Sequence, residues 1–262
     1  NMSNLRGKTA FISGGTRGIG LSIAMRLARE GADIMIAGSS EVNCLAANKT
    51  ITAQSDVQVK TCAVDLSSFE GCKAVFEAHS KTFKTCDILI HSAGATRGGV
   101  FPAQDDADFI DGFALKFHAG VRLSRLFWPS LVAARGNVVM IVGGASRTPD
   151  AKFMVGGAVN AALANFSKAL AGQGLQDDVN VNWINPGQTE TERLQQLLMT
   201  RAKDENRSID DVRAERMQAE GIRRLGQPED TAALVAFLCS EEARHVHGAG
   251  ISVDGGATKG YF

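Results

Sequence analysis

The stretch Ser13-Gly14-Gly15-Thr16-Arg17-Gly18-Ile19-Gly20 decides the fold, because it joins a strand-length apolar run to a helical pattern. Thr9–Ile12 precede it, and Ile19, Ile23 and Leu27 recur at the spacing of one helix face. Glycines let a backbone pass close to a phosphate, and a helix that begins there offers free N–H groups and the positive end of its dipole. Strand, glycine loop and helix in this order predict a dinucleotide-binding unit.

Apolar runs of strand length alternate with amphipathic segments along the rest of the chain. The runs are 33–37, 57–60, 88–90, 138–142, 179–183 and 251–253. Alternating strands and helices predict a parallel sheet, and the unbroken apolar run at 138–142 indicates a strand that is covered on both faces. We therefore predict one doubly wound α/β domain of about seven strands over residues 2–262, leaving aside Asn1, which precedes Met2.

One segment, at about residues 190–224, departs from this alternation. It mixes Arg, Lys, Glu and Asp with scattered apolar residues such as Leu197, Leu198 and Met199. It follows a late strand, and the carboxyl ends of strands in α/β proteins line the ligand crevice. Two interpretations stay open: a solvated pair of helices, or a mobile substrate lid over that crevice.

Charge and composition exclude several classes of partner. Lys plus Arg and Asp plus Glu number 28 each, so no net positive charge favours nucleic acid or an anionic membrane. No apolar run is long enough for a membrane span, and no signal peptide is recognisable. We expect a cytoplasmic protein that acts on a small molecule.

Cysteine and histidine give no sign of a metal site. The five cysteines lack the spacing of a metal or redox pair, so we expect reduced and mostly buried thiols. The five histidines are scattered, and we interpret them as surface or helix-end residues, with His91 as the one that its strand would bury. No bound metal is expected.

Further landmarks follow the glycine loop in order. They are Val64-Asp65-Leu66, Ser92-Ala93-Gly94, Asn185-Pro186-Gly187, Arg224-Leu225-Gly226-Gln227-Pro228-Glu229-Asp230 and Val253-Asp254-Gly255-Gly256. Together with the glycine loop they resemble the short-chain dehydrogenase/reductase family over nearly the whole chain. The resemblance implies a Rossmann-type fold, an oxidoreductase that acts on a carbonyl or an alcohol with a nicotinamide cofactor, and a homodimer or homotetramer.

The resemblance also assigns cofactor contacts to particular positions. It implies that Asp65 and Leu66 flank the adenine, and that Ala93 and Gly94 approach the ribose and nicotinamide side. It also implies that Pro186, Gly187, Thr189 and Thr191 meet the nicotinamide. Ser92 stands where the family usually has Asn. The expected cofactor-binding residues are Gly14, Thr16, Arg17, Gly18, Ile19, Gly20, Ser39, Ser40, Asp65, Leu66, Ala93, Gly94, Asn160, Pro186, Gly187, Thr189 and Thr191.

The end of the second strand favours NADP(H) over NAD(H). NAD-dependent enzymes place an acid there to bind the ribose 2′-hydroxyl, whereas this strand ends Ala37-Gly38-Ser39-Ser40. Arg17 supplies a cation and the two serines supply hydroxyls for a 2′-phosphate. Glu41 follows directly, and a shift of the turn by one residue would bring its carboxylate nearer.

The usual catalytic groups of the family are replaced in this chain. Family members use a Tyr, a Lys four residues later on the same helix face, a Ser and an Asn. Counting back from Phe166-Ser167-Lys168 places the Tyr position at Gly156 and the Lys position at Asn160. The same count places Gly143 at the Ser position and Lys116 at the Asn position. The only tyrosine is Tyr261, so no internal tyrosine can serve.

Three explanations stay open. In the first, Lys116 has become the proton donor, and Ser146, Arg147 or Lys152 completes the site. In the second, Tyr261 reaches the site of a neighbouring subunit. In the third, the protein binds NADP(H) without turnover, as a sensor or a partner subunit. We predict an NADP(H)-dependent oxidoreductase with a non-standard active site and an unidentified substrate, and we keep the non-catalytic binding protein as the alternative.

Overall fold

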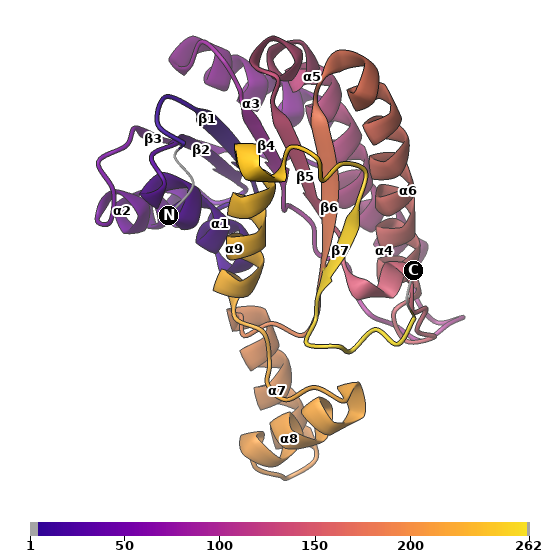
Figure 1. The fold of residues 1–262 in the computed structure, drawn as a ribbon. Coiled ribbons are helices and arrows are strands. Elements are labelled where there is room, and N and C mark those ends of the chain that lie inside the picture. Colours follow the sequence, from indigo (N-terminus) through magenta and orange to yellow (C-terminus); the bar gives the residue numbers. More distant parts are fainter. Residues whose placement is uncertain (1–4, 261–262) are drawn as a thin grey trace.

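Seven parallel strands form one sheet in the order β3-β2-β1-β4-β5-β6-β7 in the computed structural model, which describes residues 5–260 (Figure 1). This confirms the predicted doubly wound α/β fold. The strands are β1 (Thr9–Ser13), β2 (Asp33–Gly38), β3 (Val59–Ala63), β4 (Ile88–His91), β5 (Asn137–Ile141), β6 (Asn180–Pro186) and β7 (Gly250–Val253).

Helices cover both faces of the sheet (Figure 1). One face carries α1 (Gly18–Arg29), α2 (Glu41–Thr52) and α9 (Pro228–Leu238), and the other carries α3 (Phe69–Thr82), α5 (Ala119–Ala134) and α6 (Met154–Asp177). Side chains of β1 alternate between the two cores: Ile12 belongs to the first, and Phe11 stacks on Phe127 in the second at a ring-centroid distance of 5.0 Å. Because both faces are covered, β1 and β4 are buried along their whole length.

A π-helical segment, η1 (Phe113–His118), joins α4 (Asp106–Gly112) to α5 without a break. The helix approaches its neighbours closely at Gly112, where a Cβ would lie 2.8 Å from Val155 Cγ1 and 3.2 Å from Thr96 Cγ2. π-Helical turns are rare and are frequent at functional sites. This one carries Lys116.

Helices α7 (Glu192–Asp204) and α8 (Ile209–Glu220) project beyond the edge of the sheet at which β6 and β7 end (Figure 1). They share a small hydrophobic cluster of their own, which consists of Leu194, Leu198, Ala202, Val212 and Leu225. The segment 190–224 therefore contains two helices, which both interpretations allow. Its movement as a lid stays a prediction.

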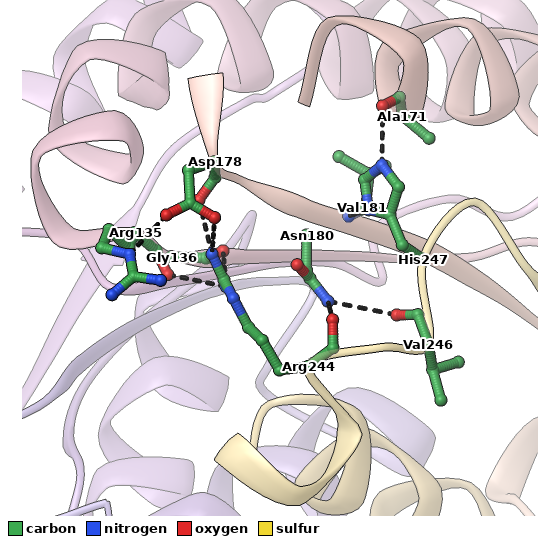
Figure 2. Close-up of polar contacts among 9 residues, drawn as sticks. All are labelled: Arg135, Gly136, Ala171, Asp178, Asn180, Val181, Arg244, Val246 and His247. Carbon is green, nitrogen blue, oxygen red and sulfur yellow. Dashed lines mark hydrogen bonds and ion pairs between the residues drawn. The ribbon is translucent and has the colours of Figure 1, made fainter. Parts of the chain in front are cut away.

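At the end of the sheet where β6 begins, Arg244 and His247 from the segment before β7 make hydrogen bonds to neighbouring segments (Figure 2). Arg244 donates to the carbonyl oxygen and the carboxylate of Asp178, at 2.7 and 2.6 Å. The backbone N–H of Val181 donates to His247 Nδ1, so His247 Nε2 carries the proton that it donates to the Ala171 carbonyl, at 2.7 Å. His247 is thus a structural bridge between β6 and α6, which the sequence did not indicate.

Buried thiols are present as expected, whereas one histidine corrects the sequence interpretation. All five cysteines are free, and four of them are buried. His79 is a helix-end residue, but it is only 2% exposed, because it packs among the rings of Phe11, Phe83 and Phe127. Over residues 5–260, no helix combines the length and the apolar character that crossing a bilayer requires.

Candidate active site

The glycine loop between β1 and α1 lies at the carboxyl edge of the sheet. Close packing within the protein explains why two of its residues are glycines. A Cβ on Gly14 would lie 2.8 Å from the backbone of Ala93, and a Cβ on Gly20 would overlap the carbonyl oxygen of Gly14. Gly18, at φ +55°, is more open, since a Cβ there would meet only the Thr191 side chain, at 3.5 Å. Packing against the segment that follows β4 therefore fixes the conformation of the loop.

The N-terminus of α1 has no cap from a side chain. Arg17 occupies the N-cap position without a capping hydrogen bond, and the first turn contains no acidic residue. By contrast, the hydroxyls of Ser40 and Ser68 cap α2 and α3. The N–H groups and the positive dipole end of α1 are therefore available to an anion. This arrangement fits the pyrophosphate of a dinucleotide.

The residues expected to select NADP(H) lie together at the end of β2. A Cβ on Gly38 would lie 2.6 Å from Thr16 Cγ2, so the glycine loop packs directly on the strand end. Arg17 and Ser39 are exposed, and neither side chain makes a hydrogen bond or ion pair with another residue of the described range 5–260. Ser40 is instead engaged as the cap of α2. The cation and one hydroxyl remain free for a 2′-phosphate.

The residues expected near the adenine and the adjoining ribose follow β3 and β4. The Asp65 carboxylate accepts from the hydroxyl and the N–H of Ser67, at 2.7 and 2.9 Å, and these bonds lower the pKa of Asp65. Leu66 beside it is buried. The backbone N–H of Ala93 donates to Ser13 Oγ at 3.1 Å, which ties the segment after β4 to β1.

The residues expected at the nicotinamide end follow β6. A Cβ on Gly187 would lie 2.7 Å from Asp254 Cα, so this glycine packs against the segment after β7. The Thr189 hydroxyl donates to the Gly187 carbonyl at 3.0 Å, and Thr191 Oγ1 accepts from the N–H of Leu194 at 3.3 Å as the cap of α7. Both threonine hydroxyls therefore already have a partner within the protein. Pro186 closes β6, and Ile19 packs partly against the core.

Polar side chains from several elements converge where β5 ends. Lys116, from η1, donates from Nζ to the carbonyl oxygen of Val142 at 2.6 Å. Gly143 follows Val142 in the chain, and a Cβ on Gly143 would lie 2.7 Å from Nδ2 of Asn160, which comes from α6. Gly143 has φ +144°, which a side chain rarely allows.

Asn185, from β6, completes this cluster. Its Oδ1 accepts from the Gly143 N–H at 3.3 Å and lies 3.5 Å from Ser146 Oγ. Asn160 Oδ1 and Asn185 Nδ2 are both buried without a hydrogen-bond partner among the described residues. Buried amides left in this condition leave hydrogen-bonding capacity for a bound molecule. We name Lys116, Ser146, Asn160 and Asn185 the β5-end cluster.

The environment of Lys116 changes its ionisation. Burial lowers the pKa of Lys116 to about 8, and the positive charge of Arg193 acts in the same direction. No carboxylate in the described part of the chain forms an ion pair with Lys116. A lysine with such a pKa holds a proton at neutral pH and releases it more readily than a lysine in water.

His91 fixes the position of Lys116 through the backbone. A carbonyl oxygen can only accept, so His91 Nε2 donates to the Lys116 carbonyl, at 2.7 Å, and Nδ1 accepts from the Ser13 hydroxyl, also at 2.7 Å. Burial lowers the pKa of His91 to about 4, and the ring is neutral at physiological pH. The expectation that its strand buries His91 is confirmed, since it is 0% exposed.

The position that the family count gives to tyrosine is filled by a different aromatic ring. A Cβ on Gly156 would overlap the ring of Phe153, the residue that precedes α6. Asn160 lies one helical turn further and is 5% exposed. The structure therefore brings Gly143 and Asn160 into contact, with Gly156 on the same helix, but it puts no hydroxyl at Gly156.

The other candidates do not join the β5-end cluster through a hydrogen bond. Arg147 donates to the Gly250 carbonyl at 3.1 Å. Lys152 is exposed on a turn, and its ammonium has no hydrogen-bond or ion-pair partner within residues 5–260. Tyr261 lies outside the described residues. Sequence reasoning missed Asn185 as a polar group of the site, although it stands in the quoted Asn185-Pro186-Gly187 landmark, and it missed Arg193.

These features define a class: an α/β protein with a Rossmann-type sheet and a dinucleotide cradle at the carboxyl edge of its strands. Comparison with known proteins is more specific. A family model described as "Enoyl-(Acyl carrier protein) reductase" matches residues 14–258. The chain therefore belongs to the short-chain dehydrogenase/reductase family, and the resemblance seen in the sequence is confirmed.

Relatives and solved structures cover almost the full chain. The "Uncharacterized oxidoreductase YvaG" of Bacillus subtilis is 31% identical over 99% of this chain and 99% of its own length. The "NADPH-dependent reductase BacG" of the same organism is 32% identical over 96% of this chain and 98% of its own length. L-sorbose reductase from Gluconobacter frateurii, solved with NADPH and L-sorbose, has a TM-score of 0.95 at 30% identity and covers 99% of this chain and 100% of its own.

Proposed function

We propose that this protein is an NADP(H)-dependent oxidoreductase that interconverts a carbonyl and an alcohol, with Lys116 as the proton donor. One observation carries this proposal: an ammonium group without a carboxylate partner stands at the end of β5, with a pKa of about 8. General acids work best when their pKa is near the operating pH. The printed names of BacG and of the sorbose reductase structure support NADPH as the cofactor.

The residues present fit this cofactor. The uncapped N-terminus of α1 would hold the pyrophosphate, and Arg17 with Ser39 would hold the 2′-phosphate. Thr16, which packs on Gly38, would fix the position of the loop relative to β2. When bound, NADPH supplies a hydride.

The remaining work falls to the protein's own side chains. The Lys116 ammonium holds a proton and gives it to the carbonyl oxygen of the substrate as that oxygen becomes an alcohol. The Val142 carbonyl and the stem packing on Gly94 fix the ammonium, and His91 fixes its backbone. The free Nδ2–H groups of Asn160 would donate to the same oxygen or to a water beside it.

The test compares binding with turnover. NADPH and NADH affinities are measured by fluorescence, and NADPH oxidation is followed with a panel of ketones, aldehydes and sugars. We expect Lys116→Met to lower kcat about 100-fold or more while the NADPH Kd stays within about threefold. Lys60→Met, at an exposed position of β3, serves as the matched control. Turnover that survives in Lys116→Met would contradict the assigned role.

The pH dependence gives a second test of the same role. Reduction needs the protonated ammonium, so kcat/KM for reduction should fall as the pH rises through about 8. In Lys116→Arg, whose side chain stays charged, this fall should disappear even if the rate is low. A decline at the same pH in both proteins would assign it to another group.

One observation favours a second candidate function, nucleotide binding without turnover. The ring of Phe153 occupies the space beside Gly156 and supplies no exchangeable proton there. Tight NADPH binding with no oxidation of the cofactor by any panel member would select this candidate. Assembly as a homodimer or homotetramer, a cytoplasmic location and the reach of Tyr261 into a neighbouring site stay predictions, and light scattering of the purified protein tests the first.

A further inference from the structure

Arg193 connects two segments at the carboxyl edge of the sheet, and its charge acts on Lys116 of the β5-end cluster. It lies in the first turn of α7, after β6, and its Nη2 donates to the carbonyl oxygen of Thr96, after β4, at 2.8 Å. In the sheet, β5 lies between β4 and β6. Arg193 therefore connects the segments that follow the two strands on either side of β5.

Lys116 also contacts the segment after β4. Its stem packs on Gly94, where a Cβ would lie 2.8 Å from Lys116 Cβ and Cγ, and Gly94 is two residues before Thr96. Its ammonium reaches the Val142 carbonyl at the end of β5. The charge of Arg193 acts on Lys116 in the direction that lowers its pKa, so two cations from different elements lie near each other at the carboxyl edge.

Neither cation is neutralised by the protein. Within residues 5–260 no carboxylate pairs with Lys116 or with Arg193. Two acidic side chains on the adjoining segments have other partners: Glu190 pairs with Arg213, and Asp108 pairs with Arg97. Glu192 and Arg193 are both exposed in the first turn of α7, and no ion pair joins them. Placing two like charges together without an acid costs free energy, and a bound anion would offset that cost.

The available donors match an oxyanion. The guanidinium of Arg193 has further N–H groups beyond the one that Thr96 accepts, and it presents them in the planar fork that suits carboxylate and phosphate. The ammonium of Lys116 has two N–H groups beyond the one that Val142 accepts. Asn160 Nδ2 adds a neutral donor beside Gly143.

We propose that the substrate carries an anionic group, a carboxylate or a phosphate, that binds between Arg193 and Lys116. This inference rests on the proposed oxidoreductase function and names the substrate class for that site. Arg193 is then a specificity-determining residue: it holds the acid end of the substrate and leaves the carbonyl within reach of Lys116.

Turnover provides the first test. NADPH oxidation is measured with pyruvate, acetoacetate and levulinate, and with the methyl ester of each acid. We expect the preferred acid to exceed its ester in kcat/KM by about tenfold or more, and Arg193→Gln to reduce that ratio to about twofold. Lys203→Gln removes an exposed cation further along the same helix and should leave the ratio unchanged. Equal kcat/KM for acids and esters would overturn the inference while leaving the oxidoreductase function intact.

A binding measurement separates this inference from the function on which it rests. The rate of Lys116 acylation by a small amine-reactive ester is followed by mass spectrometry in the NADP⁺-loaded protein, with and without acetate or inorganic phosphate. We expect either anion to slow labelling about threefold or more in the native chain and not in Arg193→Gln. Protection without any turnover would support the anion site and sink the proposed function. Absence of protection together with absence of turnover would overturn both.

The same variant decides whether the anion belongs to the substrate or to the cofactor. If Arg193→Gln weakens NADPH binding tenfold or more and leaves the acid-to-ester ratio unchanged, the pyrophosphate of the cofactor is the group that Arg193 binds, and the inference fails. If NADPH affinity stays within about threefold while the ratio collapses, the anion belongs to the substrate.

Discussion

Neutral buried histidines make the stability of this protein depend on pH. His79 and His91 have pKa values of about 4 in the folded state, against 6.5 in an unfolded chain, because burial penalises the charged ring. The unfolded chain therefore binds more protons between these values, and the free energy of unfolding falls as the pH drops from 6.5 towards 4. Between pH 6.5 and pH 4, protonation of each histidine in the unfolded chain lowers the free energy of unfolding by about 3 kcal/mol.

Urea denaturation at a series of pH values measures this loss. His79→Phe removes one of the two titrating rings and keeps an aromatic side chain among Phe11, Phe83 and Phe127, so the decline between pH 6.5 and 4 should shrink to about half. The same decline in this variant as in the native chain would contradict a role for His79.

Gly156 and Phe153 are coupled, because the ring of one fills the space beside the other. Gly156→Tyr alone should destabilise the protein by about 1–3 kcal/mol, since the Phe153 ring must leave its place. Phe153→Ala alone leaves a void, and the double variant should be more stable than the sum of the two losses predicts, by about 1 kcal/mol or more.

Equilibrium unfolding of the four proteins gives the coupling free energy for this pair. Gly172→Ala on the same helix is the control: a Cβ there meets no atom within 4 Å, and the change should be additive with Phe153→Ala.

At the scale of the residue, the sequence could predict which positions lack the usual groups but not which side chains surround them. Gly143, Gly156 and Asn160 could be singled out because the predicted spacing is local to one strand and one helix. The Phe153 ring fills the space beside Gly156 because of the direction of its side chain at the start of α6, and no periodic pattern in the sequence encodes that direction. The partner of Arg193 is 97 residues away, at Thr96, and only the folded chain brings them together.

At the scale of the element, α7 and α8 depend on their own small cluster rather than on the main cores. Leu198 is 1% exposed within that cluster, whereas its neighbour Leu197 is 51% exposed. Leu198→Ala should remove about 2–4 kcal/mol of local stability, and Leu197→Ala should have little effect.

Hydrogen exchange of the backbone amides distinguishes local from global loss. In Leu198→Ala we expect faster exchange in residues 192–220 and unchanged protection in β1 and β4. If this pair closes over the site, the same variant should raise the KM for the substrate more than the NADPH Kd. Equal loss of protection throughout the sheet would show that α7 and α8 are part of one cooperative unit.

The strands and helices were predictable in kind, and their ends were not. The run at 57–60 predicted a strand that is observed at Val59–Ala63, because Thr61 and Cys62 pair with β2 although the apolar pattern weakens there. The π-helical turn at Phe113–His118 has no signature in the apolar spacing of that helix. It begins beside Gly112, which packs closely against Val155 of α6 and Thr96 of the segment after β4, and neither neighbour can be foreseen from the helix's own sequence.

At the scale of the whole molecule, cofactor preference should appear as stability. A ligand that binds only the folded state adds about 2.7 kcal/mol when its concentration is 100 times its Kd. NADPH should therefore raise the melting temperature more than NADH at equal concentration. Arg17→Glu should reverse this order, because it removes the exposed cation of the glycine loop and introduces a charge that repels the 2′-phosphate.

Thermal shift with both nucleotides on both proteins is sufficient for this comparison. Arg29→Glu, an exposed cation at the far end of α1, controls for the change in net charge. The same nucleotide order in Arg17→Glu as in the native chain would place the 2′-phosphate elsewhere.

The order of the sheet also has a consequence for how quickly the chain reaches its native state. Strand β1 is bordered on one side by β4. The Thr9 N–H donates to the carboxylate of Asp87, just before β4, and the Ser13 hydroxyl donates to His91 Nδ1, so each bond connects positions 78 residues apart. Contacts between such distant positions can form only after a long loop has closed. Closing the loop lowers the conformational entropy of the chain before the contacts stabilise it. The glycine loop packs against Ala93, so it can reach its native conformation only after β4 has paired with β1. Nucleotide affinity should therefore be among the last properties to return during refolding, after most of the helical signal has recovered.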